Sequence, residues 1–165
     1  MTRWGNCEYK QLQHLRENLA KLQSMDLDKF CQDASRELAA RLLSLVIPRT
    51  PVGTYPKLSG KKGGTLRRGW TAKSAGDAAA GRGKPDVQAY AKSLPVFKQG
   101  HTYYIQVINP VEYASYVEFG HRTANGQGWV AGQYFLTLSE RDLERVTPAV
   151  LERKLEAMLR EVFNV

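Results

Sequence analysis

The sequence predicts an α+β domain in which N-terminal and C-terminal helices pack on a small antiparallel sheet of three to four strands. Apolar residues recur at helical spacing in residues 8–46 and again after residue 132. Between these segments, residues 102–108 read Thr-Tyr-Tyr-Ile-Gln-Val-Ile, which is rich in the β-branched and aromatic types that suit a strand. Helices on either side of a run of strands are typical of helices layered on one antiparallel sheet.

The length of 165 residues is sufficient for a single domain with a substantial core. No run approaches the roughly 18 apolar residues of a membrane span, and no apolar signal segment opens the sequence, so we expect a cytoplasmic protein without a membrane partner. The domain is expected to have a helical N-terminal part (1–48), a basic loop with the first strands (49–100), a central strand with an aromatic corner (101–131) and C-terminal helices (132–165).

Two helices are expected in the N-terminal part. The second begins after Asp26, a residue type favoured at the N-cap, and is stopped by Pro48. The first, residues 8–23, has leucines at steps of three and four that form a narrow stripe. So thin a stripe packs weakly. It either covers part of the domain's own core, the more ordinary role, or meets a neighbouring subunit. The leucine stripe consists of Leu12, Leu15, Leu19 and Leu22.

The net charge of +8 is concentrated in one part of the chain. Residues 49–100 hold eleven Lys or Arg against two acids, whereas residues 101–165 hold six against eight. This asymmetry indicates a polyanion or an acidic protein surface as partner, while a solvated loop kept soluble by its lysines is an equally open interpretation. The candidate contact residues, for DNA or a neighbouring subunit, are Arg49, Lys57, Lys61, Lys62, Arg67 and Arg68.

A loop rich in Gly and Lys spans residues 54–70, TYPKLSGKKGGTLRRGW. It superficially resembles a phosphate-binding loop, but the GxxxxGK[ST] spacing is absent and no strand precedes it, which excludes nucleotide hydrolysis. Lysines beside glycines can instead grip a sugar-phosphate backbone without reading bases.

The first strands are expected after this loop. Residues 66–73 should turn into a strand anchored by Trp70, and residues 74–86 form a loop of small residues. Apolar residues alternate over residues 87–97, which predicts one or two further strands. Pro95 places the middle of that segment at an edge or a bulge.

An aromatic corner follows the central strand, which starts from a hairpin turn at Gln99-Gly100 and ends at Asn109-Pro110. A short helix closed by Gly120 comes next. The aromatic residues of the corner are expected in the core or at an interface, and they are Tyr113, Tyr116, Phe119 and Trp129.

Helices are expected to end the chain. The first starts near residue 132 and can restart at Ser139, where Asp142 has the place of a capping-box acid. Thr147 and Pro148 have the residue types of an N-cap and a first helical position, so they predict the start of a last helix.

No catalytic constellation emerges from the sequence. The three histidines lie on a helix, a hairpin turn and a loop, and the two cysteines have neither metal-ligand spacing nor the density of a disulfide scaffold. Ser115 lacks the G-x-S-x-G turn of a hydrolase nucleophile, and Glu112 and Glu118 are expected to cap or solvate a helix. We therefore expect no enzyme, no metal site and no cofactor.

Four segments together resemble a family of tailed-phage neck and tail-completion proteins: ELAARLLSLVIPRTPVGT, GGTLRRGW, INPVEYASYVEFGHRT and GWVAGQYFLTLSERDLE. This family is typified by the gene-ten product of a lambdoid coliphage and is common in prophages of Gram-positive bacteria. The resemblance covers about residues 26–164. Its strongest pieces are the R-T-P-V…G-x-L-R motif (Arg49–Val52 and Gly64–Arg67, separated by a lengthening insert at Tyr55–Gly63) and the Y-A-x-Y-V-E-x-G motif (Tyr113–Gly120).

This resemblance implies a structural virion protein of a phage or prophage with a Gram-positive host. It would form a ring at the head–tail junction that connects head to tail and lets DNA pass, after assembly in the host cytoplasm. The implied partners are further copies of the chain (six, by analogy with sixfold tails), a head–tail connector, tail-tube or tail-terminator proteins, and non-specific DNA in the channel. A ring joins two different faces of each copy, so the leucine stripe and the aromatic corner are the candidate interfaces.

The rival hypothesis is a basic nucleic-acid-binding protein that acts outside the particle. The charge of residues 49–100 favours it, but the sequence has neither a recognition-helix motif nor a basic helix face. Mobility on a sizing column distinguishes a ring-forming subunit from a monomer that shifts with DNA.

Overall fold

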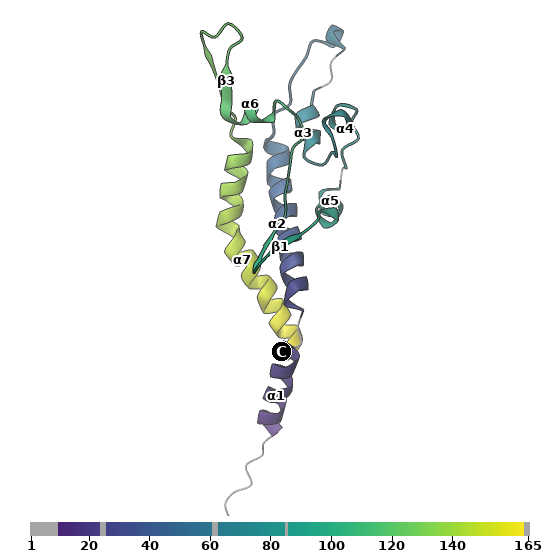
Figure 1. The fold of residues 1–165 in the computed structure, drawn as a ribbon, viewed down its shortest axis with the longest axis vertical. Coiled ribbons are helices and arrows are strands. Elements are labelled where there is room, and N and C mark those ends of the chain that lie inside the picture. The colour runs from purple at the N-terminus through teal and green to yellow at the C-terminus, as the bar shows by residue number, and fades with distance from the viewer. Residues whose placement is uncertain (1–9, 24–25, 61–62, 85, 164–165) are drawn as a thin grey trace, which may run out of the picture.

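The computed structural model describes residues 10–23, 26–60, 63–84 and 86–163. The molecule is elongated around two long helices, α2 (Leu27–Arg49) and α7 (Phe135–Phe163), which lie side by side and run in opposite directions (Figure 1). Helix α1 (Lys10–Gln23) continues the long axis beyond the end where α7 finishes. The mixture of helices and strands that the sequence predicts is present, with helices predominating.

Helix α2 begins where the sequence predicts, because Asp26 accepts a hydrogen bond from the backbone N–H of Lys29 at 2.9 Å. Pro48 lies inside its last turn rather than stopping it, and the helix ends at Arg49. The predicted and observed helix ends differ by only a few residues. Pro48 removes one backbone N–H donor without ending the helix, and the chain leaves the helix at Thr50, whose backbone is extended.

Short helices take the place of the strands expected over residues 66–73 and 87–97 and interrupt the loop expected over residues 74–86. The strand expectations were therefore wrong except at Phe97, which begins β1 (Phe97–Gln99). The short helices are α3 (Thr65–Gly69), α4 (Ala75–Ala79) and α5 (Val87–Ser93), after a 3₁₀ turn at Lys57–Ser59. Ser74 caps α4 through the N–H of Asp77 at 3.1 Å, and Asp86 caps α5 through two N–H groups. The apolar residues that alternate in α5 are largely alanines. Alanine is a strong helix former, so the Asp86 N-cap is sufficient to favour a helix over a strand here.

Two separate hairpins stand in place of the single sheet of three to four strands, which corrects the predicted sheet. Strand β1 (Phe97–Gln99) pairs with β2 (Thr102–Tyr104), and β3 (Gly120–Arg122) pairs with β4 (Trp129–Ala131), both antiparallel. The turn predicted at Gln99-Gly100 is confirmed, with Gly100 at φ 61°. The central strand is shorter than predicted because its pairing ends at Tyr104.

The short helix of the aromatic corner is confirmed as α6 (Ala114–Phe119). Gly120 follows it with φ 88°, in the region that favours glycine, and leads directly into β3. A Cβ at Gly120 would lie 2.4 Å from the carbonyl oxygen of Val130, so the close approach of β4 also requires glycine there.

Helix α7 is continuous, which corrects the predicted restart at Ser139 and the predicted new helix at Thr147-Pro148. The Ser139 hydroxyl donates to the carbonyl of Phe135 at 2.6 Å, and that of Thr147 donates to Leu143 at 2.8 Å. Both hydroxyls therefore bond back within the helix instead of capping a new one. Pro148 is accommodated in the interior.

The core lies where α2 meets α3, α5 and α7. Trp70 is its largest side chain and packs edge-on against Phe135, with ring centroids 6.2 Å apart. No helix among the described residues has the length and apolar character needed to cross a membrane. The buried apolar cluster comprises Ala39, Ala40, Leu43, Val46, Leu66, Trp70, Ala72, Ala78, Ala91, Val111 and Phe135.

Candidate functional site

The two halves of the R-T-P-V…G-x-L-R motif meet at the end of α2. Thr50 is fully buried, and its hydroxyl donates to the carbonyl of Val46 at 2.7 Å while accepting from the Trp70 indole N–H at 2.8 Å. The Arg67 guanidinium donates to the carbonyl of Thr50 from two nitrogens, at 2.7 and 3.0 Å, and to that of Pro48 at 3.2 Å. Arg67 thus satisfies backbone acceptors that the end of a helix leaves without partners.

Arg49 ties α2 to α7. Its guanidinium donates to the Ser139 hydroxyl at 3.3 Å and forms an ion pair with Asp142. The hydrogen bond from Arg49 lowers the pKa of the Asp142 carboxyl below its ordinary value of 3.8. Asp142 therefore serves this pair rather than the capping box that the sequence suggested.

Arg68 holds the following loop and α4. It donates to the carbonyls of Ala78 at 2.8 Å and Gly63 at 3.1 Å, and its third contact is the Thr65 hydroxyl at 3.4 Å. All three candidate arginines therefore bond within the chain, and their contact with DNA or a neighbouring subunit stays a prediction. The remaining candidates are Lys61 and Lys62, which lie outside the described residues, and Lys57, of which the structure describes only the backbone.

Glu118 caps a helix, as the sequence suggested, but the helix is α7 and not the short helix on which Glu118 lies. Its carboxylate is 3% exposed and accepts from the backbone N–H groups of Leu136 and Thr137, both at 2.9 Å, and from the Thr137 hydroxyl at 2.7 Å. A carboxylate bonded to the first N–H groups of a helix is a stabilising cap. An acid inside the apolar Y-A-x-Y-V-E-x-G motif is the signal for it. We refer to Arg49, Thr50, Arg67, Trp70 and Glu118 together as the joint.

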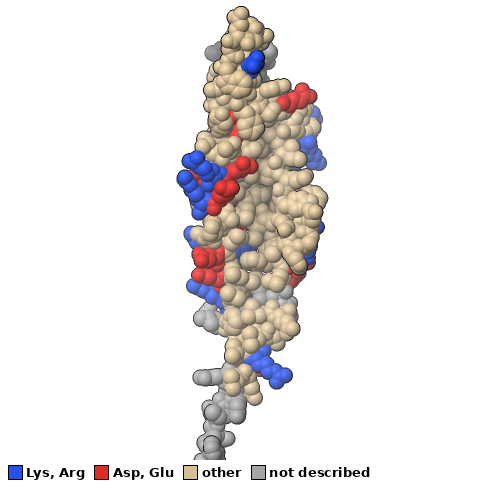
Figure 2. All heavy atoms as spheres, turned by 60° about the vertical axis from the view of Figure 1, so that its left-hand side comes forward, with Lys and Arg blue, Asp and Glu red and all other residues tan. Residues whose placement is uncertain are grey.

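The four aromatic residues predicted for the core or an interface are all exposed. Trp129 is 64% exposed, Tyr116 59%, Phe119 58% and Tyr113 44%. They lie on α6, β4 and the turn before α6, at the end of the molecule that carries the β3–β4 hairpin (Figure 1). Figure 2 shows that surface as mostly uncharged.

The leucine stripe is exposed at the opposite end of the molecule (Figure 1). Leu12, Leu15 and Leu19 are 59%, 49% and 53% exposed, and Leu22 is half-buried. Clusters of exposed apolar side chains, such as those at the two ends of this molecule, are typical of protein–protein contact surfaces.

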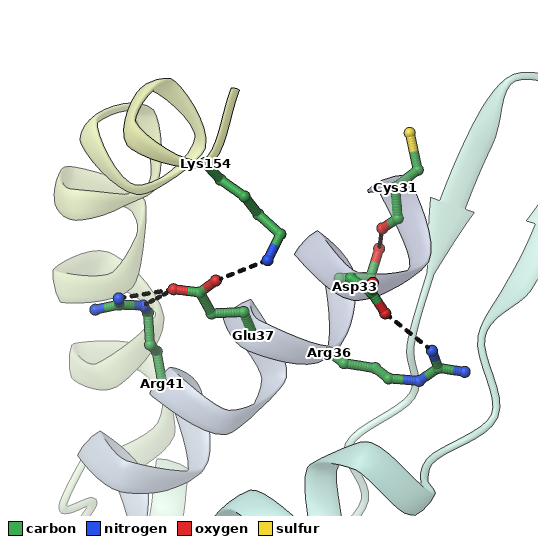
Figure 3. Close-up of polar contacts among 7 residues, drawn as sticks. Cys31, Asp33, Arg36, Glu37, Arg41 and Lys154 are labelled. Atoms are coloured by element: carbon green, nitrogen blue, oxygen red, sulfur yellow. Dashed lines mark hydrogen bonds and ion pairs between the residues drawn. The ribbon is translucent and has the colours of Figure 1, made fainter. Parts of the chain in front are cut away.

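A groove of about 920 Å³ runs between α2, α5 and α7. Glu37 is one of its lining residues and accepts from Arg41 at 2.8 Å and from Lys154 of α7 at 3.2 Å, while Asp33 pairs with Arg36 at 3.5 Å (Figure 3). The hydrogen bond from Arg41 lowers the pKa of Glu37. Each of these two carboxylates therefore has a cationic partner (Figure 3). The pair of Glu37 and Lys154 links α2 to α7.

A second polar contact holds the β1–β2 hairpin on α2. The Lys98 ammonium donates to both carboxylate oxygens of Asp28, at 2.8 and 3.0 Å, and the Tyr103 hydroxyl donates to the same carboxylate. The hydrogen bond from Lys98, followed by that from Tyr103, lowers the pKa of Asp28. Among the described residues, no three His, Cys, Asp or Glu side chains come together as a metal site would require.

Both sequence motifs lie in a region of the chain that matches a known protein family. Residues 13–120 match the family described as "Bacteriophage HK97-gp10, putative tail-component". The chain belongs to this family. It is therefore a structural tail component of a tailed phage, with a place in the virion beside other virion proteins. No curated protein and no solved structure matches the chain.

Proposed function

We propose that this tail component forms a ring of identical subunits at the head–tail junction, connects head to tail and lets DNA pass through its centre. The observation that carries the proposal is the exposure of unlike apolar surfaces at opposite ends of one elongated subunit. A closed ring needs two different contact faces on each copy, because its interfaces are head-to-tail. Six copies would match a sixfold tail, with a head–tail connector and a tail-tube or tail-terminator protein as neighbours.

The basic segment 49–100 fits the same role. In a ring, its lysines face either the channel, where contact with DNA is sequence-blind and weakens with salt, or an acidic neighbour. Tracing residues 55–70 of each copy in a reconstruction of the tail distinguishes the two positions. Absence of the chain from the particle would overturn the proposal in favour of a nucleic-acid-binding protein that acts outside the virion.

The ring contact is tested with purified protein. Replacing both Leu15 and Leu19 by Asp places charges in the leucine stripe, and the matched control Gln13→Asp places one on the opposite side of the same helix. We expect the stripe variant to elute as a folded monomer on a sizing column with light scattering, and the control to assemble like the wild type. Equal assembly of all three proteins would exclude the leucine stripe as a ring interface.

A further inference from the structure

The segment Ile105–Ile108 follows β2 and belongs to no helix or strand of the structure. It continues directly from β2 and runs as an extended trace along α2 toward α3 (Figure 1). The ladder with β1 stops at the pair of Phe97 and Tyr104, since the opposing chain then reaches Pro95, which has no N–H to donate. Within the part of the chain that the structure describes, no backbone hydrogen bond joins this segment to another residue.

The side chains of this segment alternate as they do in a half-buried strand. Ile105 and Val107 pack against the core, whereas Gln106 and Ile108 face outward on the same side as Tyr104. Ile108 is 63% exposed despite being a large apolar residue. The segment therefore combines strand-like residues with an unused backbone edge, which is a surface on which another strand can pair.

An apolar groove of about 360 Å³ lies beside this edge. A backbone edge flanked by apolar pockets is the arrangement by which proteins bind an added strand: the backbone supplies hydrogen bonds and the pockets take alternate side chains. Lys73 supplies a positive charge at the groove. Its lining residues are Ala72, Lys73, Tyr90, Leu94, Pro95, Phe97, Gln106, Ile108 and Pro110.

We propose that the β3–β4 hairpin of a second copy pairs with Ile105–Ile108 and places an apolar side chain in this groove. The hairpin has two strands and hence two outer edges, and it extends from the end of the molecule (Figure 1). A two-stranded sheet is marginal in water, so further pairing stabilises it. Trp129 and Val130, 64% and 44% exposed, are the apolar side chains that it offers.

The character of the two surfaces also favours this occupant, because an apolar groove takes an apolar strand. Residues 120–131 of the hairpin contain no Asp or Glu and one Arg, and Lys73 is the one charged residue among those that line the groove. The pairing joins two different surfaces, so it is head-to-tail and propagates around a ring. This inference rests on the proposed ring and names one of its contacts.

Proline substitutions test the pairing at the backbone. Gln106→Pro and Val107→Pro each remove one N–H, and successive N–H groups of a strand point to opposite edges. Gln106 is exposed, so Gln106→Pro should keep the circular dichroism spectrum and melting temperature of the monomer. Val107 packs against the core, so the melting temperature of Val107→Pro is compared with that of Val107→Ala, which loses side-chain packing at the same site but keeps the N–H. We expect one of the two variants to associate at least about tenfold more weakly than the wild type in sedimentation equilibrium. The matched control Gln106→Ala, which keeps the N–H, should associate normally.

Cross-linking between copies provides a second measurement. In a background with Cys7 and Cys31 replaced by Ser, Gln106→Cys and Val130→Cys proteins are mixed and oxidised. We expect a disulfide-linked pair that contains one copy of each. The strand pairing is wrong, although the ring stands, if three results coincide: the wild type assembles, both proline variants assemble equally well, and no mixed disulfide-linked pair forms. A wild-type chain that stays monomeric and is missing from the particle overturns the ring itself, and this inference with it.

Discussion

Large side chains are buried at the joint and exposed at the two ends of the molecule. At the joint, Thr50, Trp70 and Glu118 are buried and every one of them is hydrogen-bonded. At the ends, Leu12 and Trp129 are more than half exposed. The motif residues Thr50, Arg67 and Glu118 therefore hold the subunit together from within, whereas Leu12 and Trp129 lie on surfaces suited to assembly. Variants of the joint should lower stability, and variants of the ends should lower assembly.

The largest effect is expected from Trp70→Ala. This change removes the largest side chain of the core, its edge contact with Phe135 and the indole donor to Thr50, and we expect a loss of about 3–5 kcal/mol in the free energy of unfolding. Chemical denaturation followed by circular dichroism measures it. The matched variant Trp129→Ala removes an exposed indole and should change that free energy by less than about 0.5 kcal/mol while weakening assembly. Similar losses in both variants would remove the distinction between joint and ends.

Glu118→Ala should have the next largest effect. It leaves the N–H groups of Leu136 and Thr137 without their acceptor at a partly buried helix start, which costs about 1–3 kcal/mol. Hydrogen exchange should show the loss locally, as faster exchange at the first turn of α7. If only exchange at the tip of the β3–β4 hairpin accelerates, the carboxylate does not act as the cap of α7.

The sequence predicts the parts of this fold that depend on local chemistry. Asp26 as an N-cap, the Gln99-Gly100 turn and the helix closed by Gly120 follow from residue type and spacing, and the structure confirms each. The errors arise where local patterns are ambiguous. Alternating alanines in α5 suit a strand as well as a helix, and the hydroxyls of Ser139 and Thr147 can cap a helix or bond back within one.

Long-range pairing lies beyond what spacing alone can predict. Arg67 reads as a DNA-contact candidate in a basic loop, yet its guanidinium donates to a carbonyl seventeen positions away at the end of α2. Arg49 likewise reaches Asp142 across ninety-three positions. The charge of a side chain is visible in the sequence, but the acceptor that it reaches is set by the tertiary fold.

Arg67→Lys tests whether Arg67 acts through its hydrogen bonds or through its charge, and its expected loss of stability is smaller than that of Glu118→Ala. Lysine keeps the charge but not the planar fork that donates to Thr50 and Pro48, so we expect a loss of about 1 kcal/mol in the free energy of unfolding. If Arg67 instead contacted phosphate through its charge alone, the Arg67→Lys protein would bind DNA with the same salt dependence as the wild type. Thermal denaturation and salt titrations of DNA binding, made on the same two proteins, separate the structural role from the electrostatic one.

The smallest effect concerns the pH dependence of the Arg49–Asp142 pair, which lies at the border between the joint and the solvent. Arg49 lowers the pKa of Asp142 in the folded chain, so the pair contributes stability above the ordinary pKa of 3.8 and loses it as pH falls through the lowered value. Asp142→Asn should therefore have a lower denaturation midpoint than the wild type at pH 7. The difference between the two midpoints should become smaller as the pH falls below 3.8. The exposed pair of Arg160 and Glu156 gives the control variant Glu156→Gln, whose midpoint should barely change at either pH, since a solvated pair contributes little. A constant difference between wild type and Asp142→Asn at all pH values would mean that Asp142 stabilises the joint through packing rather than through its charge.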